Sequence, residues 1–265
     1  MPFVANCSLL FTEFPLLERP AAARAAGFEE IEFWWPFPSP VPDSADTDAF
    51  TAAVETAGVT LTGLNFYAGD LRGPDCGVLS VPGRAGQFRQ NVPIAVRIGE
   101  RLGVRNFNAL YGNRVAGVPA AVQDDTALES LGYAAQQAAT IGAGILIEPV
   151  SGPKPYPLRS ASDVSAVLAR LRATGTANAG MLFDIYHLAS NGEDVDAAIT
   201  AHAAEIRHVQ VADAPGRGEP GSGSLDIARH LQALRDVGYT GLTALEYVPT
   251  TADTAASLDW LKVLR

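Results

Sequence analysis

Residues 144–149 read Gly-Ile-Leu-Ile-Glu-Pro, a run of branched apolar side chains that ends in a carboxylate and is followed by proline. This pattern is typical of a β-strand that is buried on both faces and whose last side chain points into a functional site. Three later segments have the same design, and helix-like stretches separate all four. These segments cover residues 181–184, 207–210 and 242–246. They end in Asp184, Gln210 and Glu246, as the first segment ends in Glu148.

Strand-like and helix-like segments alternate along the whole chain. Eight such pairs in strict alternation predict an α/β fold with a parallel sheet that closes into a single (β/α)8 TIM barrel. The length of 265 residues fits one barrel, and no linker divides the chain, so we expect one catalytic domain over residues 1–265. A doubly wound open sheet is the alternative, but no GxGxxG follows the first strand. The expected strands are 4–11, 30–34, 59–66, 106–111, 144–148, 181–184, 207–210 and 242–246, and the expected helices are 16–26, 46–57, 85–102, 124–141, 162–174, 195–204, 225–237 and 254–264.

Composition limits the partners and the location of the protein. Acidic residues outnumber basic ones by 29 to 19, so the chain lacks the basic surface that a nucleic acid requires. Cys7 and Cys76 are expected to be unpaired, which suits a reducing compartment. No signal peptide is visible, and no apolar stretch approaches the ~20 residues that span a bilayer. We therefore expect a cytoplasmic protein with no membrane partner, and a homo-oligomer is plausible on general grounds.

The four polar residues at the strand ends predict a metal site. They follow strands five to eight of the expected barrel, which are neighbours, and the carboxyl ends of the strands form the functional face. Three carboxylates at that face would repel one another by about 4 kcal/mol per pair at ~4 Å and an effective dielectric constant of ~20. A divalent cation would remove this repulsion. Because the set offers only oxygen, we expect Mg²⁺ or Mn²⁺, held by Glu148, Asp184, Gln210 and Glu246.

Several motifs, in this order and over nearly the whole chain, resemble the hydroxypyruvate isomerase family of the xylose-isomerase-like TIM barrel superfamily. Each motif is modest alone, and together they are specific. They are Asn-Cys-Ser-Leu-Leu-Phe at 6–11, Gly-Phe-Glu-Glu-Ile-Glu-Phe at 27–33, Ala-Gly-Asp at 68–70 with Val-Pro-Gly-Arg at 81–84, Ile-Glu-Pro at 147–149, Phe-Asp-Ile-Tyr-His at 183–187, His-Val-Gln-Val-Ala-Asp at 208–213 and Arg-Gly-Glu-Pro-Gly at 217–221.

The resemblance implies a metal-dependent isomerase of the ketose–aldose type, which converts hydroxypyruvate to tartronate semialdehyde through a cis-enediolate. It implies that the same four residues bind the metal and that Glu148 and Glu246 form the acid/base pair. Glutamine at 210 resembles the hydroxypyruvate isomerase branch, since related ketose epimerases place histidine there. Ser224 and Lys154 depart from the family pattern, and these departures bear on the substrate more than on the chemistry.

Substrate contacts are expected from residues near the same face. Arg217 lies in a glycine-rich loop after strand seven, and its guanidinium suits the carboxylate of a small anionic hydroxy-oxo acid. His187 follows Asp184 by three residues and is expected to bind a substrate oxygen. Asn65 and Asn108 are candidate hydrogen-bond donors to substrate. His208 precedes Gln210 by two residues, so it should lie one layer deeper as a buried supporting residue.

Three other functions compete with this prediction. A 2-oxo-tetronate isomerase or a ketose 3-epimerase of the same superfamily would keep the metal chemistry and differ in the pocket. A metal-dependent endonuclease would require many histidines and a basic face, whereas this chain has four histidines and a net charge of -10. A non-enzymatic small-molecule binding protein is the third alternative, but its buried carboxylates would lower the stability of the fold without serving a function.

Overall fold

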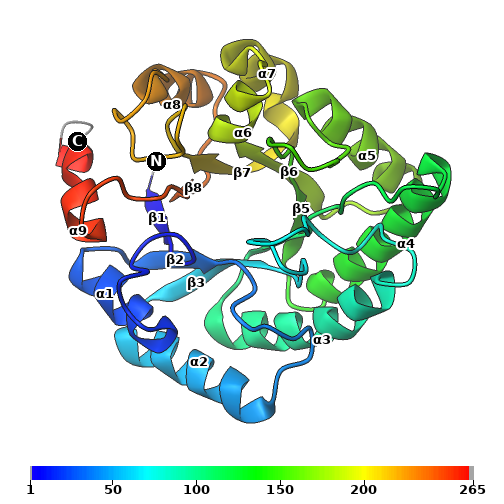
Figure 1. Ribbon diagram of the computed structural model, residues 1–265, viewed down its shortest axis with the longest axis horizontal. Coiled ribbons are helices and arrows are strands. Elements are labelled where there is room, and N and C mark those ends of the chain that lie inside the picture. Colours follow the sequence, from blue (N-terminus) through cyan, green and yellow to red (C-terminus); the bar gives the residue numbers. More distant parts are fainter. Residues whose placement is uncertain (1, 263–265) are drawn as a thin grey trace.

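The strands form a closed parallel barrel whose order around the axis follows the chain (Figure 1). The computed structural model describes residues 2–262. Parallel pairing of the first strand with the last closes the barrel, so the predicted (β/α)8 architecture is confirmed. Within the described residues the strands are β1 (Phe3–Asn6), β2 (Glu30–Phe33), β3 (Thr60–Asn65), β4 (Asn106–Asn108), β5 (Gly144–Ile147), β6 (Ala179–Asp184), β7 (Ile206–Val211) and β8 (Thr243–Leu245).

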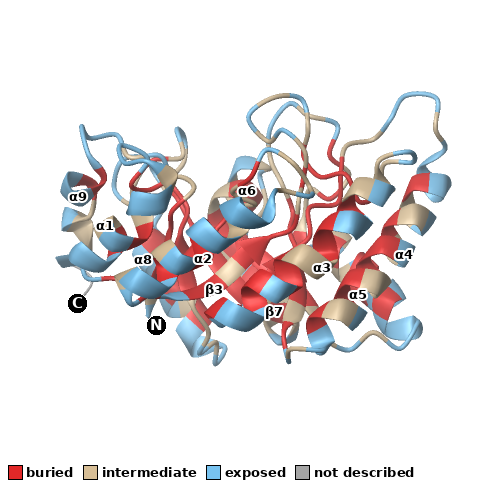
Figure 2. Cartoon of the chain, turned by 90° about the horizontal axis from the view of Figure 1, so that it is seen from below, coloured by how far each residue is buried: buried red, intermediate tan, exposed pale blue. Residues whose placement is uncertain are grey.

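Helices surround the barrel and cover the outward faces of the strands (Figure 1). Their inner faces and the strands are buried, while their outer faces are exposed (Figure 2). Within residues 2–262, none of the helices combines the length and the apolar character of a membrane-spanning segment. The described helices are α1 (Arg19–Ala25), α2 (Ser44–Ala57), α3 (Ala85–Leu102), α4 (Ala120–Ala139), α5 (Ala161–Ala173), α6 (Ile185–Ser190), α7 (Val195–His202), α8 (Ile227–Asp236) and α9 (Thr254–Ser257), with 3-10 turns at Leu16–Glu18, Ala203–Glu205 and Asp259–Lys262.

The first strand is shorter than the expected 4–11, because an asparagine turn ends it. The side-chain oxygen of Asn6 accepts a hydrogen bond from the main-chain N–H of Ser8, and its carbonyl accepts from Leu10. Asparagine commonly bends the chain in this way, since its side chain replaces a strand partner. Phe11 then takes a φ of 59°, which no strand residue adopts. The prediction of a strand through Phe11 is therefore wrong.

Other boundaries also differ from the predicted ones. The fourth strand stops at Asn108 rather than Tyr111, and α4 starts at 120 rather than 124, directly after Pro119. Helix α6 was not expected; it follows β6 at once because the Asp184 side chain accepts from the His187 N–H and caps it. The expected helix 254–264 is divided into α9 and a 3-10 turn, and its last two residues lie outside the described part.

Long loops rise from one end of the barrel, where the strands end (Figure 2). The segment 67–84 after β3 is irregular, as predicted, and it packs against the end of β4 through Gly77. Gly77 has a φ of 94°, and a Cβ atom there would collide with the main chain of Leu110. Only glycine permits this approach. Both cysteines are free, as the sequence predicted, and both are buried.

Ser160 determines where α5 begins, and this gives a direct test of the local fold. Its hydroxyl accepts from the Asp163 N–H, and the Asp163 carboxylate accepts from the Ser160 N–H at 2.9 Å, which is a capping box. We predict that Ser160→Ala lowers the free energy of unfolding by about 1 kcal/mol in urea denaturation. Ser162→Ala is the matched control, because this exposed serine does not cap the helix, and an equal loss in both variants would contradict the assignment.

Candidate active site

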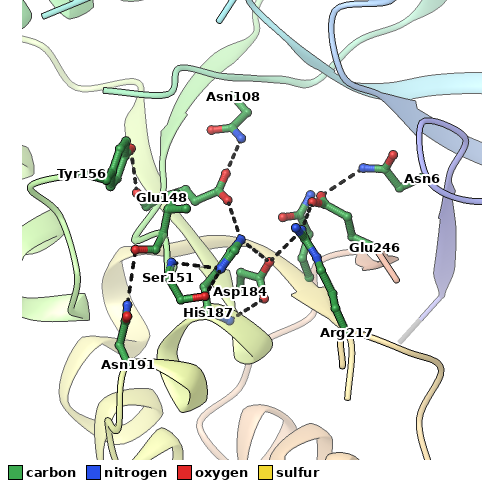
Figure 3. Close-up of polar contacts among 12 residues, drawn as sticks. Asn6, Asn108, Glu148, Ser151, Tyr156, Asp184, His187, Asn191, Arg217 and Glu246 are labelled. Atoms are coloured by element: carbon green, nitrogen blue, oxygen red, sulfur yellow. Dashed lines mark hydrogen bonds and ion pairs between the residues drawn. The ribbon is translucent and has the colours of Figure 1, made fainter. Parts of the chain in front are cut away.

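The ends of the last four strands bring the predicted polar residues to the mouth of the barrel. Asp184 and Gln210 are paired in the register of β6 and β7, while Glu148 and Glu246 directly follow β5 and β8. All four side chains are buried. Figure 3 shows Glu148, Asp184 and Glu246 facing a common centre together with His187 and Arg217. The barrel thus gathers the carboxylates that the sequence placed on separate strands.

Three of these side chains have the spacing of a metal site. Glu148, Asp184 and His187 each offer a ligand atom, and these atoms lie within 4.8 Å of one another. Glu246 lies outside this group, although it shares a cationic neighbour with Asp184. The group could therefore hold a metal ion, and its members overlap only in part with the predicted quartet. The full quartet remains a prediction.

Glu32 of β2 is the centre of a second buried network, which the sequence analysis did not identify. Its carboxylate accepts hydrogen bonds from Asn6 at 2.8 Å and from the Gln210 amide at 2.7 Å. The His208 imidazole Nε2 lies 2.8 Å from the other carboxylate oxygen. Because Glu32 takes the Gln210 N–H, the Gln210 Oε1 atom is turned away, and it is buried without a hydrogen-bond partner among residues 2–262. His208 is buried, as the sequence predicted, and its supporting role remains a prediction.

Burial controls the ionisation of the carboxyl groups at the mouth. Desolvation, followed by the neighbouring Asp184 carboxylate, raises the pKa of Glu148 to about 8, against the Asn108 hydrogen bond. Desolvation also raises the pKa of Asp184 to about 6 and that of Glu246 well above its usual range, although Arg217 opposes both shifts. Burial would raise the pKa of Glu32 as well, but His208 and the amide donors hold it below its ordinary value. Glu32 is the carboxylate that the protein itself stabilises in its ionised form.

Arg217 is the cation that lies among these carboxylates. Its Nη2 atom is 2.5 Å from Glu246 Oε1 and 4.0 Å from Asp184 Oδ2, and its guanidinium lies 5.3 Å from the centre of the Tyr186 ring. The residue has a φ of 60°, a left-handed conformation that costs a non-glycine residue roughly 1–2 kcal/mol. Such strain is retained where a side chain must be aimed at a site. Its Nε atom is buried without a partner within the described chain.

The hydrogen bonds of His187 assign its tautomer. The main-chain N–H of Ser151 donates to His187 Nδ1 at 3.0 Å, so that nitrogen carries no proton. Burial, and then the charge of Arg217, lowers the pKa of His187 well below its usual value, so the ring is neutral. The proton of the neutral ring therefore sits on Nε2, which lies 3.7 Å from both Glu148 and Asp184. In this tautomer the Nε2–H of His187 is a hydrogen-bond donor toward the two carboxyl groups, and the ring would bind a metal through Nε2 only after that proton leaves.

A cavity of about 170 Å³ connects these groups with the loops above the barrel. Its wall includes Glu148, Glu246, His187 and Arg217, so two predicted substrate-binding residues and both predicted acid/base residues line it. Asn65 lines it as well. Asn108 is placed differently: its amide donates to Glu148 Oε2 at 2.5 Å, and it lines a deeper cavity of about 140 Å³ beside Glu32. The substrate contacts of these residues remain predictions.

The sequence carried a weak signal for the residues that were missed. Glu32 sits in Glu-Ile-Glu-Phe, where a carboxylate two residues from another in a strand shares its face. Glu30 reaches Arg105 at 3.2 Å, whereas Glu32 is buried inside the barrel. No sequence pattern could indicate Ser151, because it contacts His187 through its main-chain N–H, which every residue except proline has.

The matches to known proteins agree with this architecture. The family model described as xylose isomerase-like TIM barrel matches residues 20–264. A putative hydroxypyruvate isomerase of Streptomyces coelicolor is 52% identical over 264 residues, covering 98% of this chain and 95% of the relative. The hydroxypyruvate isomerase of Escherichia coli is 30% identical with 99% of both chains covered. A 2-oxo-tetronate isomerase of Cupriavidus necator is 32% identical, covering 98% of this chain and 97% of the relative.

The closed eight-stranded barrel, together with full-length relatives that are named as isomerases, identifies this protein as an isomerase. The chain belongs to the xylose isomerase-like TIM barrel family, and its full-length relatives include proteins named as hydroxypyruvate isomerases and as a 2-oxo-tetronate isomerase. The resemblance inferred from the motifs is confirmed, and the interpretation as a non-enzymatic binding protein is wrong.

The raised pKa of Glu148 predicts a pH-dependent stability in metal-free protein. The folded-state pKa of about 8 lies above the ordinary 4.5, so the protonated carboxyl contributes fully below about pH 4.5 and this contribution is lost as the pH rises toward 8. Glu148→Gln imitates the protonated form. In EDTA, its Tm relative to wild type should therefore increase from pH 5 to pH 8 and level off above.

Glu29→Gln is the matched control, because the Glu29 side chain is 83% exposed. Its Tm difference from wild type should not follow this curve. A pH-independent difference for Glu148→Gln would mean that burial does not perturb this carboxyl.

Proposed function

We propose that this isomerase interconverts hydroxypyruvate and tartronate semialdehyde (2-hydroxy-3-oxopropanoate). The observation that carries the proposal is that Glu148 and Glu246 follow two different strands and that their buried carboxyl groups line one cavity. Moving a carbonyl by one carbon requires a group that removes a proton and a group that returns one, and two carboxyl groups that face one cavity suit both tasks. The names of the full-length relatives support the same reaction.

Glu148 and Glu246 would serve as the acid/base pair. One carboxylate removes a proton from C3 of hydroxypyruvate, leaving a cis-enediolate, and a protonated carboxyl delivers a proton to C2, while the hydroxyl proton moves from O3 to O2. In the reverse direction the roles exchange. Asn108 holds one oxygen of Glu148, and Asn6 and Arg217 hold the two oxygens of Glu246. These bonds fix the carboxyl planes, which is what proton transfer at a defined carbon demands.

The residues at the mouth fit a divalent cation. The buried Gln210 Oε1 atom lacks a hydrogen-bond partner within the described part of the chain, and the carboxyl groups of Glu148, Asp184 and Glu246 are all buried near it. This oxygen-rich donor set suits Mg²⁺ or Mn²⁺, and we propose that these four residues would hold it. When bound, the cation would polarise the substrate carbonyl and hydroxyl and make the hydrogen on the carbon beside them more acidic.

His187 and Arg217 would orient the substrate. The Nε2–H of His187 is a donor at the cavity wall, since Ser151 holds the other ring nitrogen as an acceptor. Arg217 positions Glu246 and has an Nε–H without a partner in the described chain. Both groups donate only, so they suit oxyanion character that develops on the substrate during proton transfer.

A 2-oxo-tetronate is the second candidate substrate, because a 2-oxo-tetronate isomerase is 32% identical to this chain over nearly its full length. It shares the carboxylate and the neighbouring carbonyl and hydroxyl, and differs by one carbon. The cavity of about 170 Å³ is smaller than the roughly 300 Å³ at which drug-sized pockets begin, which favours acids of three or four carbons over a six-carbon ketose. A nucleic acid is disfavoured by the charge of -10.

Proton NMR in D₂O tests the reaction. Protein loaded with Mg²⁺ or Mn²⁺ should convert hydroxypyruvate into tartronate semialdehyde that carries deuterium at C2. We predict that Glu246→Gln and Glu148→Gln each lower turnover by about 10²–10⁴-fold, the usual contribution of general acid–base catalysis, while Glu29→Gln keeps wild-type activity. If deuterium enters a four-carbon 2-oxo acid while hydroxypyruvate does not react, the proposed chemistry stands and the proposed substrate is wrong. If Glu246→Gln and Glu148→Gln both turn over at the wild-type rate, these residues are not the acid/base pair.

Metal content tests the proposed ligand set separately. We predict that wild-type protein retains one equivalent of Mn²⁺ after gel filtration and that Asp184→Asn retains at least tenfold less, measured by elemental analysis. Asparagine keeps the oxygen that caps α6, so the helix is preserved while the charge is removed. Asp259→Asn is the control, because Asp259 is exposed and bonds Lys262. Equal metal content in all three proteins would exclude Asp184 as a ligand.

A further inference from the structure

Lys154 is a cationic residue of the cavity that the proposed mechanism does not use. It lies in the loop between β5 and α5, and its ammonium donates to the main-chain carbonyls of Leu71 at 3.1 Å and Asp75 at 2.6 Å. Both carbonyls belong to the long loop after β3, and both residues line the cavity with Lys154. An ammonium group has three donors. Two are engaged by these carbonyls, and one is left.

The charge of Lys154 is not matched by a carboxylate. Among residues 2–262, no carboxylate oxygen forms an ion pair with its ammonium, and the nearby Asp75 carboxylate instead pairs with Arg84 at 2.7 Å. Arg217, the other lysine or arginine of the cavity wall, is balanced by Glu246 and Asp184. Arg217 is the residue that the sequence predicts for the substrate carboxylate. The Arg217 guanidinium already pairs with the carboxylates of Glu246 and Asp184. Lys154 is therefore the cation of the cavity wall whose charge is available to an anionic substrate.

The loop that carries Lys154 is anchored to the catalytic strand end. Pro153 and Pro155 flank the lysine and restrict its main chain. The Tyr156 hydroxyl donates to the Glu148 carbonyl at 3.1 Å and accepts from the Tyr111 N–H at 3.0 Å. The position of Lys154 is therefore tied to that of Glu148, as a specificity residue requires. The carboxyl groups enter the cavity from the barrel, and Lys154 enters from the loops above it.

We infer that Lys154 binds the carboxylate of the substrate and makes the enzyme selective for hydroxy-oxo acids over neutral ketoses of equal length. This inference rests on the proposed function, because it assigns the anionic end of the molecule whose other carbons lie between Glu148 and Glu246. A fixed ammonium with a free donor forms a charge-assisted hydrogen bond to a carboxylate oxygen. A ketose has a neutral hydroxymethyl group at that place and gains much less.

A pair of substrates that differ only at this group tests the inference. Hydroxypyruvate and dihydroxyacetone share the carbonyl and the reacting hydroxymethyl carbon, and only the first has a carboxylate. For Lys154→Met, kcat/KM for hydroxypyruvate should fall roughly 10- to 150-fold, which corresponds to one hydrogen bond to a charged group, mainly through KM. Deuterium exchange into dihydroxyacetone should change less than threefold. Lys154→Arg should restore part of the selectivity.

Lys262→Met is the matched control, since the chain has only these two lysines and Lys262 is 79% exposed. It should behave as wild type with both substrates. If Lys154→Met lowers the rates for the charged and neutral substrates equally, the lysine only joins the two loops and the inference is overturned. The same holds if neither rate changes.

Binding of D-glycerate and glycerol, measured by calorimetry, separates this inference from the proposed reaction. Wild-type protein should bind the carboxylate ligand more tightly than glycerol, and Lys154→Met should lose that preference. If hydroxypyruvate is not isomerised but the preference is present and depends on Lys154, the proposed reaction is wrong and the carboxylate site stands. If wild type shows no preference for D-glycerate, the carboxylate site is wrong.

Discussion

The burial of several carboxyl groups at the mouth of one barrel is the constraint on which the rest of the structure depends. Glu32, Glu148, Asp184 and Glu246 are all nearly inaccessible to solvent. Each loses hydration that an isolated charge can replace only with hydrogen bonds or an opposite charge. The lost hydration is replaced to different extents at the different carboxyl groups. Glu32 receives three polar partners, whereas Glu148 receives one strong donor and keeps a pKa of about 8.

The carboxyl groups therefore differ in what they contact: Glu32 bonds other side chains of the barrel, and Glu148 and Glu246 face the cavity. Glu32 bonds side chains from β1 and β7 to β2, so it links the strands on both sides of the closure of the barrel. By taking the amide hydrogen of Gln210, it leaves the Gln210 oxygen directed elsewhere. Glu148 and Glu246 have raised pKa values and line the open cavity. Glu32 thus orders the side chains around it, whereas Glu148 and Glu246 are the carboxyl groups that a substrate in the cavity would meet.

The loops complete what the strands begin. Arg217, in its left-handed conformation, reaches back to Glu246 and Asp184. The loop after β5 holds Tyr156 beneath Glu148 and directs Lys154 to the carbonyls of the loop after β3. Three loops from different strands therefore surround one cavity. This arrangement is common in barrels of this type, where the strands provide a rigid base and the loops determine which substrate enters.

The sequence by itself determined the barrel and the polar strand ends. The period of its apolar runs and the alternation with helices are local properties, so Glu148, Asp184, Gln210 and Glu246 could be assigned to neighbouring strands from spacing alone. The tertiary structure decided how these groups are connected. Glu32 meets residues 26 and 178 positions away, the tautomer of His187 depends on the main chain of Ser151, and Lys154 contacts a loop about 80 residues earlier in the chain. Hydrogen bonds of this kind form between parts of the chain that only the closed barrel brings together, and no local pattern records them.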